Sequence, residues 1–515
     1  MRMKTLWLTL SILSTGATGL IYEYILSTVS SYILGNSIEQ FSITIAVMLL
    51  FMGLGGYFQK KLSDKNLVEK FITVELSISL LGSLLVITVY LAYIHLENFY
   101  LVYYLLASIT GLLIGLEIPI VLRINEKYQK SLKENLSLIY SADFLGAFIG
   151  ALVWVYLLLK YFSIIQIGYI VSSVNLLIAF ITFIIFKRNL KRNVLIIIVS
   201  ISIFILNVLG FTFSKKIEAY LQKSMFKDPV IYHKRTNYQD ITITKNVKNG
   251  ELRLYINGNL QFCSTDERLY HELLVHPPIA LLNELKNVLV LGGGDGLAVR
   301  ELLKYGNINI TLVDLDKGMI EIAKEKPLSI LNENAFYNKN VKVINEDAFI
   351  YLDKLIKSKK NFDLVIVDFP DPSNINLAKL YSLEFYRKIY KILNFNGIVS
   401  IQATSPYFAS KTYLCIEKTL KMAGFNTLKY HYDIPSFGDW GFILAYRGRK
   451  DLIENKLKNF SLKILDTYFL TDELFKASLI FPKNWLKYSE KDIKVNTIFN
   501  PVIIKYYNEE NRFDW

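Results

Sequence analysis

The chain has 515 residues and a formal net charge of +13, and 52% of its residues are hydrophobic. This length exceeds one ordinary domain, and the hydrophobic share is too high for a wholly soluble enzyme, so we expect a membrane region. The basic residues are scattered beside hydrophobic segments, which disfavours nucleic-acid binding, and the two cysteines and five histidines have neither a disulfide pattern nor metal-ligand spacing, so we predict no metal.

The first part of the chain is a series of long apolar runs separated by short polar loops. We count seven candidate spans, at residues 6–34, 41–57, 71–93, 100–122, 138–159, 164–186 and 194–213. Most reach the roughly 20 residues that a helix needs to cross the hydrocarbon core of a bilayer. The sequence therefore predicts a multi-pass α-helical membrane domain over residues 1–215.

Alternate loops of this region are basic. They carry Arg2 and Lys4, then Lys60, Lys61, Lys65 and Lys70, then Arg123, Lys127, Lys130 and Lys133, then Lys187, Arg188, Lys191 and Arg192. Basic loops lie on the cytoplasmic side, so the N-terminus should lie there too. Seven crossings would leave the remaining chain outside, away from the metabolites of the cytosol. One segment that does not cross fully, a hidden re-entrant piece or an outward-facing enzyme would each resolve this conflict.

Lys215 and Lys216 follow the last span and favour an inside end. We expect a multi-pass protein of the cell (inner) membrane with its catalytic part in the cytoplasm.

Three acids, Glu23, Glu117 and Asp143, lie within the apolar segments. A charged group at the centre of a membrane helix costs about 2.5–3.5 kcal/mol on insertion scales. These acids either face a bundle interior or cavity that suits a cationic solute, or lie near segment ends or beside Ser and Tyr hydroxyls.

Residues 229–275 have the alternating pattern of short strands, with a turn at residues 248–250, and predict a small antiparallel β domain. A helix then opens with Thr265 or Asp266 as its expected cap. Capping does not explain the Tyr-His-Glu run at residues 270–272 on the same helix.

Residues 287–317 predict a strand, a glycine turn, a helix and a second strand. An apolar run at 288–291 leads into Gly292, Gly293 and Gly294, and a helix opens near Leu297. Glycine lets the backbone approach a ligand closely, and the second strand, 308–313, ends in Asp314, where a ribose hydroxyl would be bound. An ordinary βα turn would also need glycine, but the complete order of elements favours a nucleoside site.

Asp295 places a carboxylate inside this glycine turn. Helix N-termini favour anions, so the turn would otherwise suit a phosphate or a carboxylate. Asp295 repels such groups and attracts an amine. The sequence therefore indicates a nucleoside that carries a cation without a nearby carboxylate.

Two further strands, 341–345 and 362–367, are each followed by acids. The carboxyl ends of parallel strands lie at one edge of a sheet. The acids that come after all four predicted strands should therefore converge at that edge, and they are Asp295, Asp314, Asp347, Asp368 and Asp371. Each could instead cap the next helix, but five around one crevice favour a cationic substrate. We expect a Rossmann-like domain over residues 276–449, followed by a tail, 450–515, without an interpretable motif.

Together these motifs resemble the polyamine aminopropyltransferases, or spermidine synthases, over roughly residues 232–446. The matching segments are YQD at 238–240, LQFCSTDERLYHE ending at Glu272, VLVLGGGDG, LVDLD, EDA at 346–348, DFPDP and GIVSIQATSP. The preceding bundle, KLYS at 379–382 and PSFGDWGF at 435–442 resemble the membrane-fused branch of that family.

The resemblance implies transfer of a 3-aminopropyl group from decarboxylated S-adenosylmethionine, as co-substrate and without a further cofactor, to a diamine. Putrescine as acceptor would give spermidine and 5′-methylthioadenosine. The implied donor-binding residues are Gln239, Gly292, Gly294, Asp295, Asp314, Asp347 and Ala348. The implied general base is Asp368. The implied polyamine-binding residues are Gln261, Tyr270, His271, Asp295, Asp368 and Asp371.

The expected partners are the diamine, the nucleoside donor and the lipid bilayer, with no nucleic acid, and a homodimer or larger oligomer stays open. Two departures from the family pattern affect the acceptor more than the donor. Residues 373–375 replace a Gly-Pro after Pro372, and the turn at 435–438 replaces a longer loop with a tyrosine.

Two alternatives remain. An S-adenosylmethionine-dependent methyltransferase shares the sheet and the glycine loop, but it should avoid an acid at Asp295 and does not explain Asp368 with Asp371. A polyamine-binding transporter or sensor is favoured only by the acids within the membrane segments.

Overall fold

The computed structural model describes residues 2–34, 37–129, 131–187, 190, 193–236, 238–448, 450–463, 466–489 and 491–510. Lys130, Arg188, Lys191 and Arg192 of the basic loops lie outside these residues. The chain forms two compact units, a helical unit of residues 1–227 and an α/β unit of residues 228–515. The last long helix continues past the expected domain boundary at residue 215 and ends at Met225.

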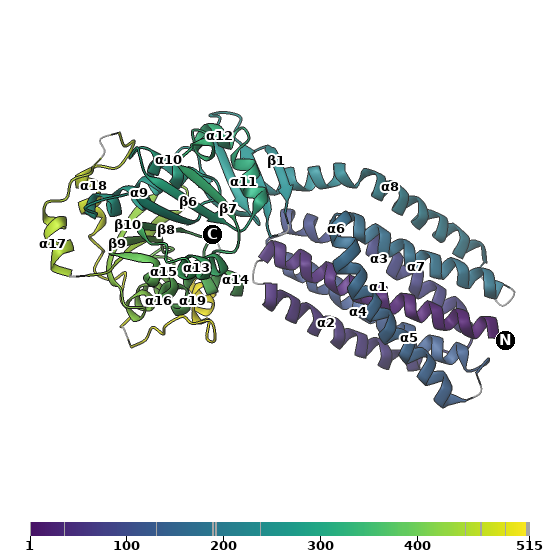
Figure 1. The fold of residues 1–515 in the computed structure, drawn as a ribbon. Coiled ribbons are helices and arrows are strands. Elements are labelled where there is room, and N and C mark those ends of the chain that lie inside the picture. Colours follow the sequence, from purple (N-terminus) through teal and green to yellow (C-terminus); the bar gives the residue numbers. More distant parts are fainter. Residues whose placement is uncertain are drawn as a thin grey trace. The chain divides into compact units, whose positions relative to one another are not determined.

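The helical unit consists of long helices that follow the seven apolar runs (Figure 1). They are α1 (Arg2–Leu34), α2 (Ser37–Phe58), α3 (Leu67–His95), α4 (Phe99–Asn125), α5 (Leu132–Val153), α7 (Ile164–Phe186) and α8 (Asn193–Met225). A π-helical turn, Trp154–Leu158, and α6 (Leu159–Tyr161) extend α5. Within the described residues, seven helices are long and apolar enough to cross a membrane. Their insertion, and the side on which the α/β unit lies, stay predictions.

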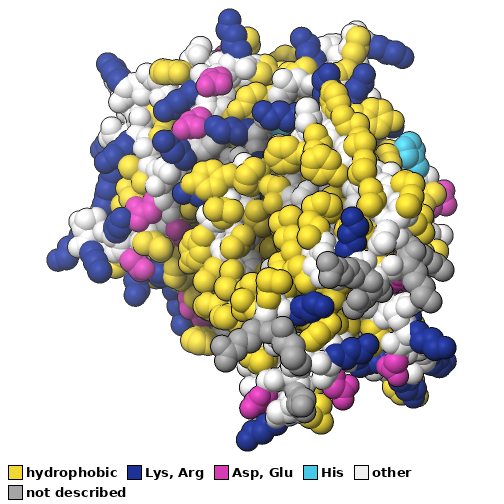
Figure 2. Space-filling view, turned by 90° about the vertical axis from the view of Figure 1, so that its right-hand side faces the viewer, with side chains coloured by type: hydrophobic (Ala, Val, Ile, Leu, Met, Phe, Trp, Pro, Cys, Tyr) yellow, Lys and Arg dark blue, Asp and Glu magenta, His cyan; other side chains and the backbone are white. Residues whose placement is uncertain are grey.

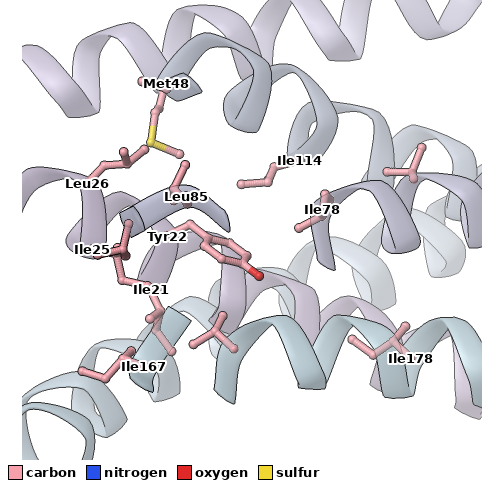
Figure 3. Packing of buried hydrophobic residues seen from close by; sticks show 14 of the residues in the cluster. Ile21, Tyr22, Ile25, Leu26, Met48, Ile78, Leu85, Ile114, Ile167 and Ile178 are labelled. Carbon is pink, nitrogen blue, oxygen red and sulfur yellow. The ribbon is translucent and has the colours of Figure 1, made fainter. Parts of the chain in front are cut away.

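Apolar packing and close backbone approach hold the helical unit together. Tyr22 of α1 lies in a cluster with Leu85 of α3 and Ile114 of α4 (Figure 3). A Cβ added at Gly146 of α5 would clash with the backbone of Leu13 in α1, so these two helices pack closely only because this position has no side chain.

Apolar side chains also cover the outside of this unit. Phe144 and Phe148 of α5 and Ile198 and Phe204 of α8 are exposed. Figure 2 shows hydrophobic side chains over much of the face turned toward the viewer, with most basic side chains toward its edge. A surface of this kind is consistent with the predicted contact with lipid.

Two of the three acids singled out in the helices are buried. Glu23 and Glu117 are 8% and 3% exposed, whereas Asp143 is partly exposed. Glu117 lies near Glu75, a fully buried acid of α3 that the sequence analysis did not single out. The Asn175 amide donates to Glu75 over 2.9 Å. Glu117 therefore faces the bundle interior.

The α/β unit contains two sheets. The small sheet is antiparallel, with β1 (Val230–Arg235), β2 (Asp240–Lys245), β3 (Leu252–Ile256) and β4 (Asn259–Cys263) in that order. The large sheet has the order β10-β11-β9-β8-β5-β6-β7. Its strands are β5 (Asn287–Gly292), β6 (Asn309–Asp314), β7 (Val341–Asn345), β8 (Phe362–Asp368), β9 (Leu393–Gln402), β10 (Asn426–Ile434) and β11 (Gly438–Tyr446). The expected combination of a helical region with a small antiparallel and a Rossmann-like sheet is confirmed.

Helices and the C-terminal segment cover both faces of the large sheet. The helices are α9 (Glu267–Leu281), α10 (Leu297–Leu303), α11 (Lys317–Ala323), α12 (Leu328–Leu331), α13 (Ala348–Lys357), α14 (Ile375–Ala378), η5 (Lys379–Tyr381), α15 (Leu383–Ile392), α16 (Ser410–Met422), α17 (Lys450–Lys458), α18 (Asp472–Ser478) and α19 (Val502–Glu510). Helix α9 runs across the boundary expected at residue 275.

Alternate residues of the central strands pack into two different cores, because successive side chains of a strand point to opposite faces. Val288 and Val290 belong to one core, and Leu289 and Leu291 to the other. Residues of the tail enter both, among them Phe475 in the first and Ile503 in the second. The tail is therefore an integral part of the α/β unit.

The cap expected at the start of α9 is confirmed in position only. Asp266 occupies the N-cap position, but its side chain makes no cap bond to the helix. Its carboxylate accepts hydrogen bonds from the backbone N–H of Ser436, over 2.7 Å, and from the Ser436 hydroxyl, over 3.0 Å. The Thr265 hydroxyl donates to Glu251 over 3.1 Å. Asp266 thus joins α9 to the turn between β10 and β11.

A buried ion-pair network joins α9 to α10. The Arg300 guanidinium contacts both carboxylate oxygens of Glu267, over 2.7 and 2.9 Å, and donates to Glu301 over 2.8 Å. All three residues are at most 2% exposed. The network fixes the helix that carries Tyr270 relative to the helix that follows the glycine loop.

Arg300→Met should destabilise the α/β unit by about 3–5 kcal/mol, because it removes the buried cation that Glu267 and Glu301 share. Thermal unfolding of the detergent-solubilised protein measures this loss. The matched control is Arg268→Met, which breaks a partly exposed pair with Glu333 and should cost under about 1 kcal/mol. Equal losses in the two variants would contradict the importance of the buried network.

Candidate active site

The predicted acids line one edge of the large sheet. Strands β7, β6, β5 and β8 are adjacent and parallel, so their carboxyl ends share that edge. Asp314 ends β6, Asp368 ends β8, and Asp347 follows β7. In the strand register Gly292 lies opposite Asp368, which places the start of the glycine loop beside the end of β8.

The glycine loop approaches two of these acids so closely that side chains would not fit. Gly292 has φ +83°, and a Cβ there would clash with the backbone carbonyl of Asp368. A Cβ at Gly294 would lie 2.7 Å from the Asp314 carboxylate. The Gly293 N–H donates to the Asp368 carbonyl over 3.1 Å. The loop therefore holds Asp314 and Asp368 near one space.

Asp295 combines a structural and an electrostatic role. Its carboxylate accepts a hydrogen bond from the backbone N–H of Leu297, over 2.9 Å, at the start of α10. Burial raises the pKa of Asp295, and the charge of His271 opposes this shift. Because Asp295 remains partly exposed, it can still meet a ligand cation.

Asp368 is held by the helix that carries the Tyr-His-Glu run. The Tyr270 hydroxyl donates to its carboxylate over 2.7 Å. Burial raises the pKa of Asp368 to about 6, while His271 and Tyr270 favour its charged form. At neutral pH the group is therefore a carboxylate that can accept a proton.

His271 is buried beside Glu267. Its Nδ1 donates to the Glu267 carboxylate and backbone carbonyl, over 2.9 and 2.7 Å. Burial lowers the pKa of His271, but Glu267, Asp295 and Asp368 outweigh this effect and raise the pKa to about 9. His271 is therefore an imidazolium at neutral pH. Its positive charge offsets the repulsion between Asp295 and Asp368.

Asp371 is fixed by donors that the sequence analysis did not identify. The Gln402 amide at the end of β9 donates to one carboxylate oxygen over 3.3 Å, and the Tyr507 hydroxyl of α19 donates to the other over 3.0 Å. Burial raises the pKa of Asp371 to about 6, and both donors oppose the shift. Gln402 lies in the quoted motif GIVSIQATSP, whereas no local pattern indicates Tyr507.

Asp347 caps α13 by accepting from the Phe349 N–H over 2.8 Å, as the capping alternative proposed. Its second oxygen accepts from the Lys379 ammonium over 2.6 Å. Ala348, the next residue, is 6% exposed. Lys379 lies in the KLYS segment, but its partner was not predicted.

The two glutamines of the small sheet differ in their surroundings. The backbone carbonyl of Gln239 accepts from the Thr236 N–H over 2.8 Å, and the Thr236 hydroxyl donates to Asp316 over 2.8 Å. This contact ties the turn at Gln239 to the loop after β6. The Gln261 amide donates to the backbone carbonyls of Asn259 and Leu260, and both hydrogen bonds lie within β4.

One buried cluster has ligand types that a metal could use. Ligand atoms of Glu272, His276 and Glu301 lie within 4.8 Å of one another. Glu301 already contacts Arg300 and Lys304, over 2.8 Å each, and these cations oppose a metal ion. The Glu272 carboxylate accepts backbone N–H groups of residues 468–470. The cluster therefore joins α9, α10 and the tail.

The acids gathered at one edge of the large sheet are suited to a cationic ligand. A family model for the spermine/spermidine synthase domain matches residues 267–459. A polyamine aminopropyltransferase of Leptospira interrogans is 38% identical over 503 residues, or 97% of this chain and 98% of that protein. Another, of Oceanobacillus iheyensis, is 35% identical over 499 residues, or 95% and 94%.

The crystal structure of spermidine synthase from Thermotoga maritima is 28% identical and covers 50% of this chain and 87% of that chain, with a TM-score of 0.44. The sequence matches over nearly the whole length show that the chain belongs to the polyamine aminopropyltransferase family. It is an enzyme, and the family resemblance inferred from its motifs is confirmed. The matched length includes the helical unit as well as the α/β unit.

A dication should stabilise the protein mainly when the acids are ionised. Burial raises the pKa of Asp314, Asp368 and Asp371 to about 6, above the value of about 3.9 in an unfolded chain. Each of these carboxyl groups therefore binds its proton more tightly in the folded state than in the unfolded state. As the pH rises from about 4 to about 6 and the protons are lost, the free energy of unfolding falls. A bound dication offsets the repulsion only above that range.

Thermal unfolding with and without 1,4-diaminobutane tests this expectation. The midpoint should rise by about 5 °C at about pH 7.5, and by much less at about pH 5. Butane-1,4-diol is the uncharged control and should have little effect at either pH. A pH-independent shift, or an equal shift with the diol, would contradict an acidic site.

Proposed function

We propose that the enzyme transfers a 3-aminopropyl group from decarboxylated S-adenosylmethionine to putrescine, giving spermidine and 5′-methylthioadenosine. The observation that carries the proposal is the carboxylate of Asp295 in the glycine loop, close to the charges of His271 and Asp368. A methyl donor with its own carboxylate would be repelled there. A donor with an ammonium group in its place would be attracted.

The donor would bind along the edge formed by β5, β6 and β7. Asp314 would bind the ribose hydroxyls, because it ends the second parallel strand and its carboxylate, which accepts the Asp316 N–H over 2.8 Å, also lies beside the backbone of Gly294. Asp347 and Ala348 would contact the adenine, and Gln239 would approach from the small sheet. Gly292 and Gly294 would leave room for the nucleoside, while Asp295 would hold the amino group of the propyl chain.

Asp368 would act as the general base. An ammonium of the diamine transfers a proton to the Asp368 carboxylate, and the nitrogen lone pair then attacks the propyl carbon bonded to sulfur. The carbon–sulfur bond breaks, and its electrons remain on sulfur as the neutral thioether of methylthioadenosine. Tyr270, hydrogen-bonded to Asp368, would keep the carboxylate oriented during this step.

The remaining acceptor residues would orient the diamine. Asp371 would bind the second ammonium, with Gln261 at the edge of the small sheet and the Tyr270 ring against the methylene chain. His271 would not bind the diamine directly, because an imidazolium repels an ammonium. It would instead aid diamine binding through Asp295 and Asp368, since its positive charge allows these two carboxylates to stay close together.

Release of methylthioadenosine tests the proposed reaction. Full-length protein in detergent would be incubated with decarboxylated S-adenosylmethionine and, separately, 1,4-diaminobutane, 1,5-diaminopentane or spermidine. We expect the highest turnover with 1,4-diaminobutane. S-adenosylmethionine, which carries the additional carboxylate, is the matched donor control and should support no transfer. Donor binding without release for any amine would refute the proposal.

Asp368→Asn should lower kcat by at least about 100-fold, because the amide cannot accept the proton of the attacking ammonium. Donor affinity, measured by titration calorimetry, should stay within about twofold, since donor contacts are assigned to other residues. Asp363→Asn, at the opposite end of β8, is the matched control and should keep full turnover. A variant Asp368→Asn with unchanged kcat would show that another group is the base.

A further inference from the structure

The final segment of the described chain, residues 491–510, packs on the part of the α/β unit that carries Asp371. The buried side chain of Asn496 donates to the backbone carbonyls of Ala378 and Tyr381, over 2.9 and 3.0 Å. The Leu383 N–H donates to the Asn496 carbonyl over 2.9 Å. This segment therefore supports the chain between β8 and α15.

Helix α19 is held at both ends. Ile503, in its first turn, is fully buried in the core on one face of the large sheet. Glu510, its last residue, accepts backbone N–H groups of Lys411 and Thr412 in the first turn of α16, over 2.9 and 3.3 Å. An acid at the start of a helix is stabilised by the unpaired N–H groups there. These contacts fix the position of Tyr507 between them.

Tyr507 is the point where α19 meets the acidic edge. Its hydroxyl donates to Oδ2 of Asp371 over 3.0 Å, while the Gln402 amide donates to Oδ1 over 3.3 Å. Gln402 itself is 2% exposed, and its amide nitrogen, which has two hydrogens, also lies 2.5 Å from the Phe369 carbonyl and 2.6 Å from the Tyr381 hydroxyl, so its contact with Asp371 is the weakest of the three. Both oxygens of the Asp371 carboxylate therefore have a donor nearby, one on β9 and one on α19, and the Tyr507 hydroxyl is the closer of the two.

We propose that Tyr507 is a positioning residue for the acceptor amine, acting through Asp371, so that the C-terminal helix forms part of the acceptor subsite. This inference rests on the proposed function, in which Asp371 binds the ammonium that does not react. It gives a function to a tail in which the sequence has no interpretable motif.

The consequence of this arrangement is a fixed separation between two carboxylates. Asp368 receives the reacting end of the diamine and Asp371 the other end, so the distance between them selects the length of the methylene chain. If the Asp371 carboxylate could rotate, the enzyme would discriminate less between diamines with longer and shorter methylene chains. Tyr507 thus contributes to selectivity as well as affinity.

Tyr507→Phe removes the hydroxyl and keeps the ring. We expect the KM for 1,4-diaminobutane to rise by about tenfold, the usual range for a lost hydrogen bond to a charged group, with kcat and the KM of the donor little changed. The ratio of kcat/KM between 1,4-diaminobutane and 1,5-diaminopentane should move toward unity. Unfolding midpoints show whether the variant is folded.

Tyr506→Phe is the matched control on the same helix. The Tyr506 hydroxyl accepts from the Lys494 N–H over 3.2 Å, so its loss weakens a contact within the tail. It should leave the acceptor KM and the selectivity unchanged. An equal rise in acceptor KM in both variants would mean that the tail acts only by its overall stability, which would overturn the proposal.

A double-mutant cycle tests the proposed role of Tyr507 separately from the proposed function of the enzyme. If Tyr507 acts through Asp371, Tyr507→Phe should have no further effect on the acceptor KM in an Asp371→Asn background. Additive effects would overturn the proposal for Tyr507, while wild-type turnover still supported the proposed function. A wild-type protein without turnover would overturn the proposed function, and this inference with it.

Discussion

The active site depends on one buried interaction, the contact of Glu267 with Arg300 and His271. Arg300 neutralises Glu267 from α10, and Glu267 keeps His271 protonated on α9. The resulting imidazolium faces carboxylates that would otherwise repel one another. Without such a cation, two neighbouring buried carboxylates raise one another's pKa, which favours uptake of a proton. The ion pair between two helices thus allows acids at the ends of separate strands to remain charged together, ready for a cationic substrate.

The sequence contains enough local information for the large sheet and most of the site. Apolar strands that end in acids, together with the topology of parallel sheets, predict that Asp314, Asp347 and Asp368 share one edge. The glycine loop is predictable for the same reason, because residues without Cβ atoms indicate close backbone approach, which the structure shows at Gly292 and Gly294. Apolar length alone also predicts the seven long helices.

The contacts that escaped prediction join residues far apart in the chain. Tyr507 reaches Asp371, Ser436 binds Asp266, and Glu75 lies beside Glu117. Each of these residues is unremarkable in its own segment, since hydrogen bonding across such separations leaves no periodicity or spacing. Asp266 illustrates this, because its local sequence favours a helix cap, whereas its carboxylate accepts a hydrogen bond from the backbone N–H of the distant residue Ser436. Local sequence preference therefore predicts the helices and strands, whereas the hydrogen-bond partners of their side chains depend on long-range contacts.

The register that places Gly292 opposite Asp368 has a consequence for how such a site can change. The glycine loop and Asp368, the proposed base, are neighbours in one hydrogen-bonded ladder, so their separation is a property of the sheet backbone and hardly depends on side-chain substitutions. Asp371, in contrast, takes its orientation from residues on β9 and α19. Under the proposed function, substitutions in those peripheral elements would alter which amine is accepted while the chemistry of the donor stays intact, so the two halves of the reaction would be separable in evolution.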